Sequence, residues 1–137
     1  MAGRTRFSGR TAVLGTPGSP VWILPQTQAS GIVWPGFDTE DVPSGALSGN
    51  AVTVKLVSVT GPADVSVYTT NSLGSPTIWF DSGDGLPDAR TIAVNTHANW
   101  AFDAAGTYTA TFEVTATTSG GTPITTGQKT YNFTVRP

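Results

Sequence analysis

Apolar and polar residues alternate strictly along residues 107–117. One face of this stretch carries the apolar side chains of Tyr108, Ala110, Phe112, Val114 and Ala116. The opposite face carries threonines and a single glutamate, Glu113. A period of two residues is typical of a strand that is buried on one side only. The stretch therefore predicts a half-buried antiparallel strand.

The same alternation recurs in shorter segments, at residues 32–34, 51–59, 65–68, 77–80, 91–94 and 130–135. The composition fits this pattern, because 16 glycines and 10 prolines punctuate a chain of 137 residues, and no segment has the period of a helix. Many short strands without crossover helices are typical of two packed antiparallel sheets. We therefore expect one all-β domain, an immunoglobulin-like antiparallel β-sandwich, over residues 31–137.

Residues 1–30 differ from the rest, because Gly, Pro, Ser and Gln interrupt two short apolar islands. This composition predicts an extended N-terminal arm. A segment that exposes apolar groups is expected to lie on a surface, either of the same chain or of a neighbour. The residues predicted to make that contact are Arg4, Arg6, Phe7, Arg10, Val21, Trp22, Ile23 and Leu24.

A tyrosine follows a glycine by two residues in the segment Gly106-Thr107-Tyr108, where a late strand begins. This spacing fits a tyrosine corner, in which the phenol hydroxyl folds back to bond a backbone group near the preceding turn. We expect Tyr108 to have this structural role.

Residues 97–109 carry a recognisable motif. The run His97-Ala98-Asn99-Trp100-Ala101-Phe102, followed by Gly106 and Tyr108, resembles the signature of the actinobacterial surface-anchored protein repeat. The resemblance extends over about residues 31–136 and implies a wall-associated β-sandwich used for display or adhesion. It makes His97, Asn99, Trp100 and Tyr108 signature residues with a structural role.

The candidates for catalytic or metal chemistry are few. The family usually has two histidines, two positions apart, before its Asn-Trp pair, whereas here Asn95 takes the first position and His97 is the only histidine. The chain has no cysteine, and the spacing of Asp81, Asp84 and Asp88 does not match a calcium loop. Since one histidine falls short of a zinc or copper site, we expect no metal, no cofactor and no enzymatic activity.

Charge and targeting features narrow the choice of partner. The formal net charge is −2, so neither nucleic acid nor an anionic membrane is the expected partner. No apolar stretch resembles a secretory signal or a membrane span, and we expect synthesis in the host cytoplasm without a signal peptide.

A wall-type sandwich without an export signal favours a virion protein. We expect a capsid decoration protein of an actinobacterial bacteriophage, localised on the capsid surface and docked through its arm on the major capsid protein or another virion protein. Homo-oligomers such as trimers are expected at the symmetry axes of a shell. The alternative is an adhesin or carbohydrate-binding module of a phage tail or cell surface, which would bind a host cell-surface glycan beside Trp79.

Overall fold

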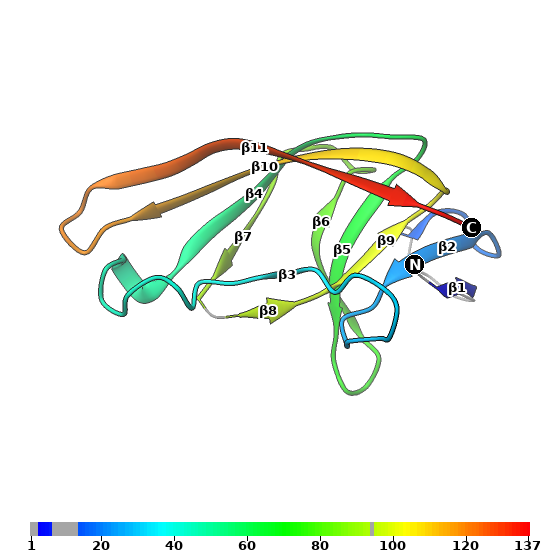
Figure 1. Ribbon diagram of the computed structural model, residues 1–137, viewed down its shortest axis with the longest axis horizontal. Helices are drawn as coiled ribbons and strands as arrows, with labels where there is room; N and C mark the ends of the chain where they lie inside the picture. Colours follow the sequence, from blue (N-terminus) through cyan, green and yellow to red (C-terminus); the bar gives the residue numbers. More distant parts are fainter. Residues whose placement is uncertain (1–2, 7–13, 94) are drawn as a thin grey trace.

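The computed structural model describes residues 3–6, 14–93 and 95–137 (Figure 1). Within these residues the fold is all-β, as the alternation predicts, with two antiparallel sheets, no α-helix and a 3-10 turn, η2 (Ser48–Asn50). One sheet has five strands in the order β1 (Gly3–Arg6), β2 (Pro20–Leu24), β9 (Asn99–Phe102), β5 (Val65–Thr70) and β6 (Pro76–Asp81). The other has four strands in the order β11 (Pro123–Val135), β10 (Gly106–Thr117), β4 (Val52–Thr60) and β7 (Asp88–Ile92). A short pair, β3 (Gly36–Phe37) with β8 (Thr96–His97), completes the fold.

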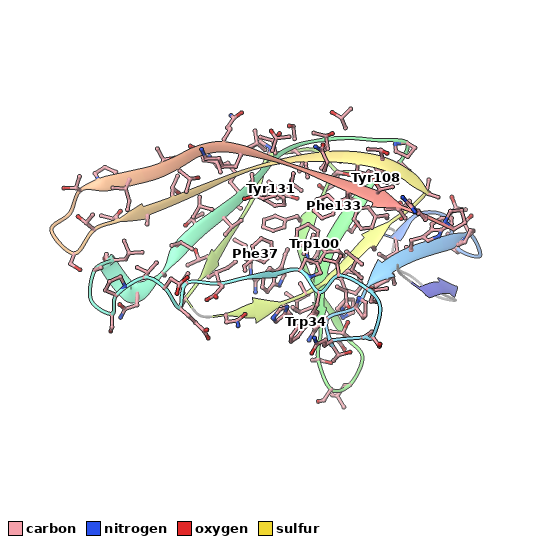
Figure 2. The ribbon with its side chains drawn as sticks, viewed as in Figure 1. Trp34, Phe37, Trp100, Tyr108, Tyr131 and Phe133 are labelled. Carbon is pink, nitrogen blue, oxygen red and sulfur yellow. The ribbon has the colours of Figure 1, made fainter. Side chains whose placement is uncertain are left out.

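One hydrophobic core draws side chains from both sheets. Trp100 of β9 and Phe112 of β10 come from opposite sheets, and their ring centroids are 5.9 Å apart. Phe37 contacts both rings, stacking on Trp100 at 5.6 Å and meeting Phe112 edge-on at 6.2 Å (Figure 2). Burying aromatic side chains of this size contributes about 1.5–3 kcal/mol each, and tilted or stacked pairs add to that. The core therefore holds the two sheets together without any disulfide.

The predicted N-terminal arm is corrected by the structure in its second half. Residues 20–24 form β2, which pairs with β9 on one side and with β1 on the other. Val21, Ile23 and Leu24 are all buried, Val21 to 2% exposure. Leu24 belongs to the core between the sheets and Trp22 packs against it, whereas Val21 and Ile23 belong to a smaller cluster with Tyr68 and Ala101. A run of β-branched and aromatic residues is well suited to a pleated, buried strand, and pairing with β9 gives this run its place in the sheet.

The other residues predicted to bind a partner lie at or near the start of the chain. Arg4 and Arg6 belong to β1, whose backbone pairs with β2. Phe7 and Arg10 lie outside the described residues. The buried apolar residues of β2 cannot serve as exposed anchors, so any docking surface must lie elsewhere.

The strand predicted at residues 32–34 is absent, and the neighbouring pair Gly36–Phe37 forms β3 instead. The ring of Trp34 stacks on His97 with centroids 3.6 Å apart, and its indole N–H donates to the Gln26 carbonyl at 3.0 Å. These contacts hold the segment as a loop and leave Phe37 as the residue that enters the core.

Tyr108 makes the contact that the sequence predicts. Its ring is fully buried, its hydroxyl donates to the Ala104 carbonyl at 2.7 Å, and the Ala104 N–H donates back to it at 3.2 Å. A Cβ on Gly61 would lie only 2.2 Å from the ring, so Gly61 is needed for this packing. The phenol thus joins the turn before β10 to the end of β4.

We predict that Tyr108→Phe lowers the free energy of unfolding by about 1–3 kcal/mol, because both Ala104 backbone groups lose a buried partner. Urea unfolding followed by tryptophan fluorescence measures this change. Tyr131→Phe is the matched control and should stay within about 0.5 kcal/mol of the wild type, because that side chain is exposed. Equal effects of the two substitutions would contradict a structural role for the Tyr108 hydroxyl.

Candidate binding groove

The two sheets differ in length, which leaves part of one inner face without an opposing strand. Strands β10 and β11 have 12 and 13 residues, whereas β5 and β6 have six each. The β10–β11 hairpin therefore extends beyond the five-stranded sheet, as seen at the left of Figure 1. Apolar side chains on the inner face of this extension need another cover, and the chain supplies only part of it.

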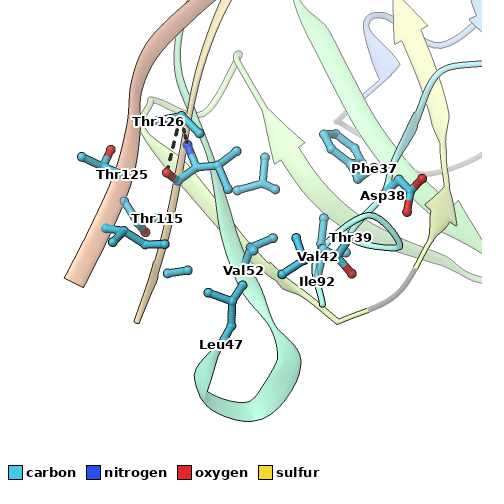
Figure 3. Close-up of a pocket in the computed structure, with 14 residues that line it drawn as sticks. Phe37, Asp38, Thr39, Val42, Leu47, Val52, Ile92, Thr115, Thr125 and Thr126 are labelled. Atoms are coloured by element: carbon cyan, nitrogen blue, oxygen red, sulfur yellow. Dashed lines mark hydrogen bonds between the residues drawn. The ribbon is translucent and has the colours of Figure 1, made fainter. Parts of the chain in front are cut away.

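A groove of about 390 Å³ lies beneath this hairpin (Figure 3). The hairpin forms one wall, β4 and β7 contribute Val52 and Ile92, and the segment 37–47 forms the facing wall. Most of its lining is apolar: Phe37, Val42, Leu47, Val52, Val54, Ile92, Val114, Ala116 and Ile124. A concave site of this size with few polar groups is typical of a binding site for an apolar group.

The facing wall is held by hydrogen bonds at both ends. The Thr39 hydroxyl donates to the Ala93 carbonyl at 3.2 Å, just after β7. The Ser119 N–H donates to the Ala46 carbonyl at 2.9 Å, in the turn between β10 and β11. Leu47 is buried between these points. The shape of the groove is thus fixed by hydrogen bonds to both neighbouring elements.

An irregularity in the hairpin shapes the other wall. The pairing of β10 with β11 shifts between Glu113 and Thr115. At this point the Thr126 hydroxyl accepts from the Val114 N–H at 3.0 Å, replacing a backbone partner. A bulge of this kind bends and twists the strand that carries it. It places Ile124 at the mouth of the groove, where the side chain is 46% exposed.

Acidic residues gather on the facing wall. Asp38, Glu40 and Asp41 are all exposed there, and Asp38 accepts from the Glu40 N–H at 2.6 Å. Among the described residues, neither lysine nor arginine lines the groove. The site therefore combines an apolar floor with an acidic lip, in which Asp38 lines the groove and the other two acidic residues lie on the same exposed segment. This arrangement favours a ligand that is apolar and positively charged.

Few features of the sequence predict this groove. Its lining comes from five separate segments, and alternation alone predicts only that Val114 and Ala116 face inward. Phe37 and Val42 lie in a stretch rich in glycine, proline and acidic residues, without periodicity. The unequal lengths of β5 and β10 are the one signal that could have indicated an uncovered face.

The signature residues have structural contacts away from the groove. His97 Nδ1 lies 3.1 Å from the Pro35 carbonyl oxygen. The Asn99 side chain accepts from the Gln26 N–H at 2.8 Å and donates to the Thr70 hydroxyl at 3.2 Å, so it joins β9 to the ends of β2 and β5. Trp100 is buried in the core. Together with Tyr108, these residues position the loops around the five-stranded sheet.

Trp79 does not form the exposed platform that a glycan-binding site beside it would need. Its side chain is only 8% exposed, since it packs against Phe37 on one side. The Arg90 guanidinium lies 4.8 Å from its ring centroid and covers it further. Stacking on a sugar requires an open aromatic face, so Trp79 cannot be the side chain on which a glycan stacks.

Three carboxylates lie close together where β5 and β10 begin. Asp81 is buried and accepts from the Gly83 N–H at 2.9 Å, and a Cβ on Gly83 would lie 2.9 Å from Asp64 Oδ2. Burial, followed by the charges of Asp64 and Asp81, raises the pKa of Asp103 to about 6. Burial is also the main reason that the pKa of Asp81 is raised. In the part of the chain that the structure describes, no group of three or more potential ligands is arranged to hold a metal ion.

No helix in the described part of the chain has the length and apolar character needed to cross a membrane. Comparison of the sequence and structure with protein-family models, curated proteins and solved structures finds no match. A function for this chain therefore has to be inferred from its groove and its fold.

We predict that Asp103→Asn stabilises the protein at neutral pH and has little effect near pH 4. A carboxyl whose pKa rises from 3.8 to about 6 on folding binds its proton more tightly in the folded state. Stability is then lost as the pH rises between these two values, and an uncharged amide escapes that loss. Thermal unfolding across this pH range measures the difference. Asp41→Asn, at an exposed site, is the control for loss of one negative charge, and an equal stabilisation by both would contradict the prediction.

Proposed function

We propose that this chain is a structural virion protein that decorates the capsid of an actinobacterial bacteriophage. In this proposal its two sheets form an immunoglobulin-like sandwich that projects from the shell. The groove beneath the β10–β11 hairpin attaches it to the major capsid protein or another virion protein. Its role is binding and display, without catalysis.

The groove is the main observation that supports the proposed attachment. Binding energy at protein interfaces is concentrated in a few apolar side chains that enter a fitted pocket. This groove offers such a pocket, with Val42 and Ile124 exposed at its mouth. The acidic lip adds electrostatic selection. A capsid segment with an apolar side chain next to lysine or arginine is the partner that these features fit.

The architecture supports the display role. The core is built from packed aromatic rings, and Tyr108 and Asn99 fix the connections between strands through side-chain hydrogen bonds. A chain without cysteine has no disulfide to lose, so its fold keeps its shape in both reducing and oxidising surroundings. The motif at residues 97–109, which resembles that of wall-associated display domains, supports the same role.

We predict that Ile124→Asp abolishes attachment to capsids of the phage that encodes this chain, because a carboxylate in the apolar groove is left without a partner. Purified protein would be mixed with undecorated shells, and co-sedimentation would be measured. Ile78→Asp is the matched control, since Ile78 is 36% exposed on β6, outside the groove. The control should sediment with the shells like the wild type, and circular dichroism should show both variants folded.

Two results would count against different parts of the proposal. If wild type and Ile124→Asp sediment equally with the shells, attachment through the groove is wrong. If the wild-type protein neither sediments with shells nor is detected by mass spectrometry in purified virions, the virion function itself is wrong.

A further inference from the structure

Among the residues that the structure describes, strand β11 forms a long outer edge of the four-stranded sheet (Figure 1). It has 13 residues, and its pairing with β10 runs without a shift from Gln128 to Val135. Strands in globular proteins commonly have about 5–6 residues. The outer side of such an edge presents backbone N–H and C=O groups that can pair with a further strand.

The second half of β11 lacks the usual protection against such pairing. Pro123, the bulge opposite Glu113 and the charge of Lys129 all fall in its first half. Residues 130–135 contain no charge and no proline. By contrast, the edge strand β7 has only five residues, with Asp88 and Arg90 among them. Proline and charged residues prevent an exposed edge from pairing with another strand. Because β11 has them only in its first half, residues 130–135 are open to pairing.

An apolar hollow lies directly beside this unprotected half. It measures about 230 Å³, and its lining is Leu24, Val33, Phe102, Asn132, Phe133, Thr134 and Val135. Val33 at its margin is 70% exposed, and Tyr131 on the inward side of β11 is 54% exposed. A strand added to β11 would cover this hollow if its inward side chains were apolar and its outward ones polar.

Strand β11 itself has this pattern. Tyr131 and Phe133 face inward, as their pairing opposite Ala110 and Tyr108 of β10 requires. Thr130, Asn132 and Thr134 face outward. The edge therefore complements a second copy of itself, which is the condition for a symmetric two-fold interface.

We propose that β11 pairs antiparallel with β11 of a second copy about a two-fold axis at Asn132. This register places Tyr131 opposite Phe133 of the second copy, and aromatic cross-strand pairs are stabilising. Thr130 faces Thr134 of the second copy on the outer side. The two copies of Lys129 are then separated by about 20 Å along the strands, beyond the range of strong repulsion. Two four-stranded sheets become one continuous sheet, and the hollow is covered from both sides.

The test introduces charges at the symmetry axis, at position 132. The wild-type protein should form a concentration-dependent dimer in sedimentation velocity. Asn132→Asp sets two carboxylates opposite each other and should weaken the dimer roughly tenfold or more. Asn132→Lys should weaken it similarly, and an equimolar mixture of the two variants should recover a dimer containing one copy of each. Thr107→Asp, which adds the same charge to the same sheet face one strand inside the edge, should leave the dimer intact.

Each alternative outcome overturns the pairing. A wild-type protein that stays monomeric at millimolar concentration rules it out. A dimer that Asn132→Asp leaves unchanged, or a mixture that fails to recover the dimer, rules out this edge and register. The result is separate from capsid attachment, because Ile124→Asp changes the groove and leaves residues 130–135 untouched.

Discussion

The contact between Phe37 and Trp100 is the interaction on which the other features of this structure depend. Trp100 belongs to the middle strand of the five-stranded sheet, whereas Phe37 comes from a short segment at the margin of both sheets. Their stacking, with further contacts from Phe37 to Phe80 and Phe112, ties that segment to the core. Because residues 38–47 follow directly, the same anchor determines where the facing wall of the groove lies. The position of the candidate groove thus follows from the way the core is closed.

The contrast between the well-predicted and the poorly predicted parts has a physical basis. The strand at residues 107–117 was evident because one side of it faces the core and the other faces solvent, so burial imposes a period of two. Strand β2 was assigned to an arm because Pro20 and Pro25 bound a run of only four apolar residues. Its place in the sheet is decided by pairing with β9, which lies more than 70 residues away in the sequence. Local composition carries no information about such a partner.

The candidate groove was hidden from the sequence for a related reason. Val114 and Ala116 obey the same alternation as Ala110 and Phe112, yet only the latter pair has the five-stranded sheet above it. Alternation shows which face of a strand is apolar, and it cannot show where the opposing layer ends. The same applies to Tyr131, which faces inward opposite Ala110 and is nevertheless 54% exposed. The candidate binding surfaces of this fold therefore lie where inward-facing apolar residues remain exposed.

The groove and residues 130–135 of β11 would recognise a partner through different interactions, and this difference suits them to different partners. The groove selects by shape and charge, since its floor is apolar and Asp38 lines it on a segment that also carries the exposed Glu40 and Asp41. The edge selects mainly through backbone hydrogen bonds, which require only an extended partner with the right alternation. A dissimilar protein is best recognised by the first kind of surface, and an identical copy by the second. Since the bulge at Glu113 separates the two regions along one hairpin, both can be occupied at once. A shell covered by paired copies would then gain avidity from two attachment sites in each dimer.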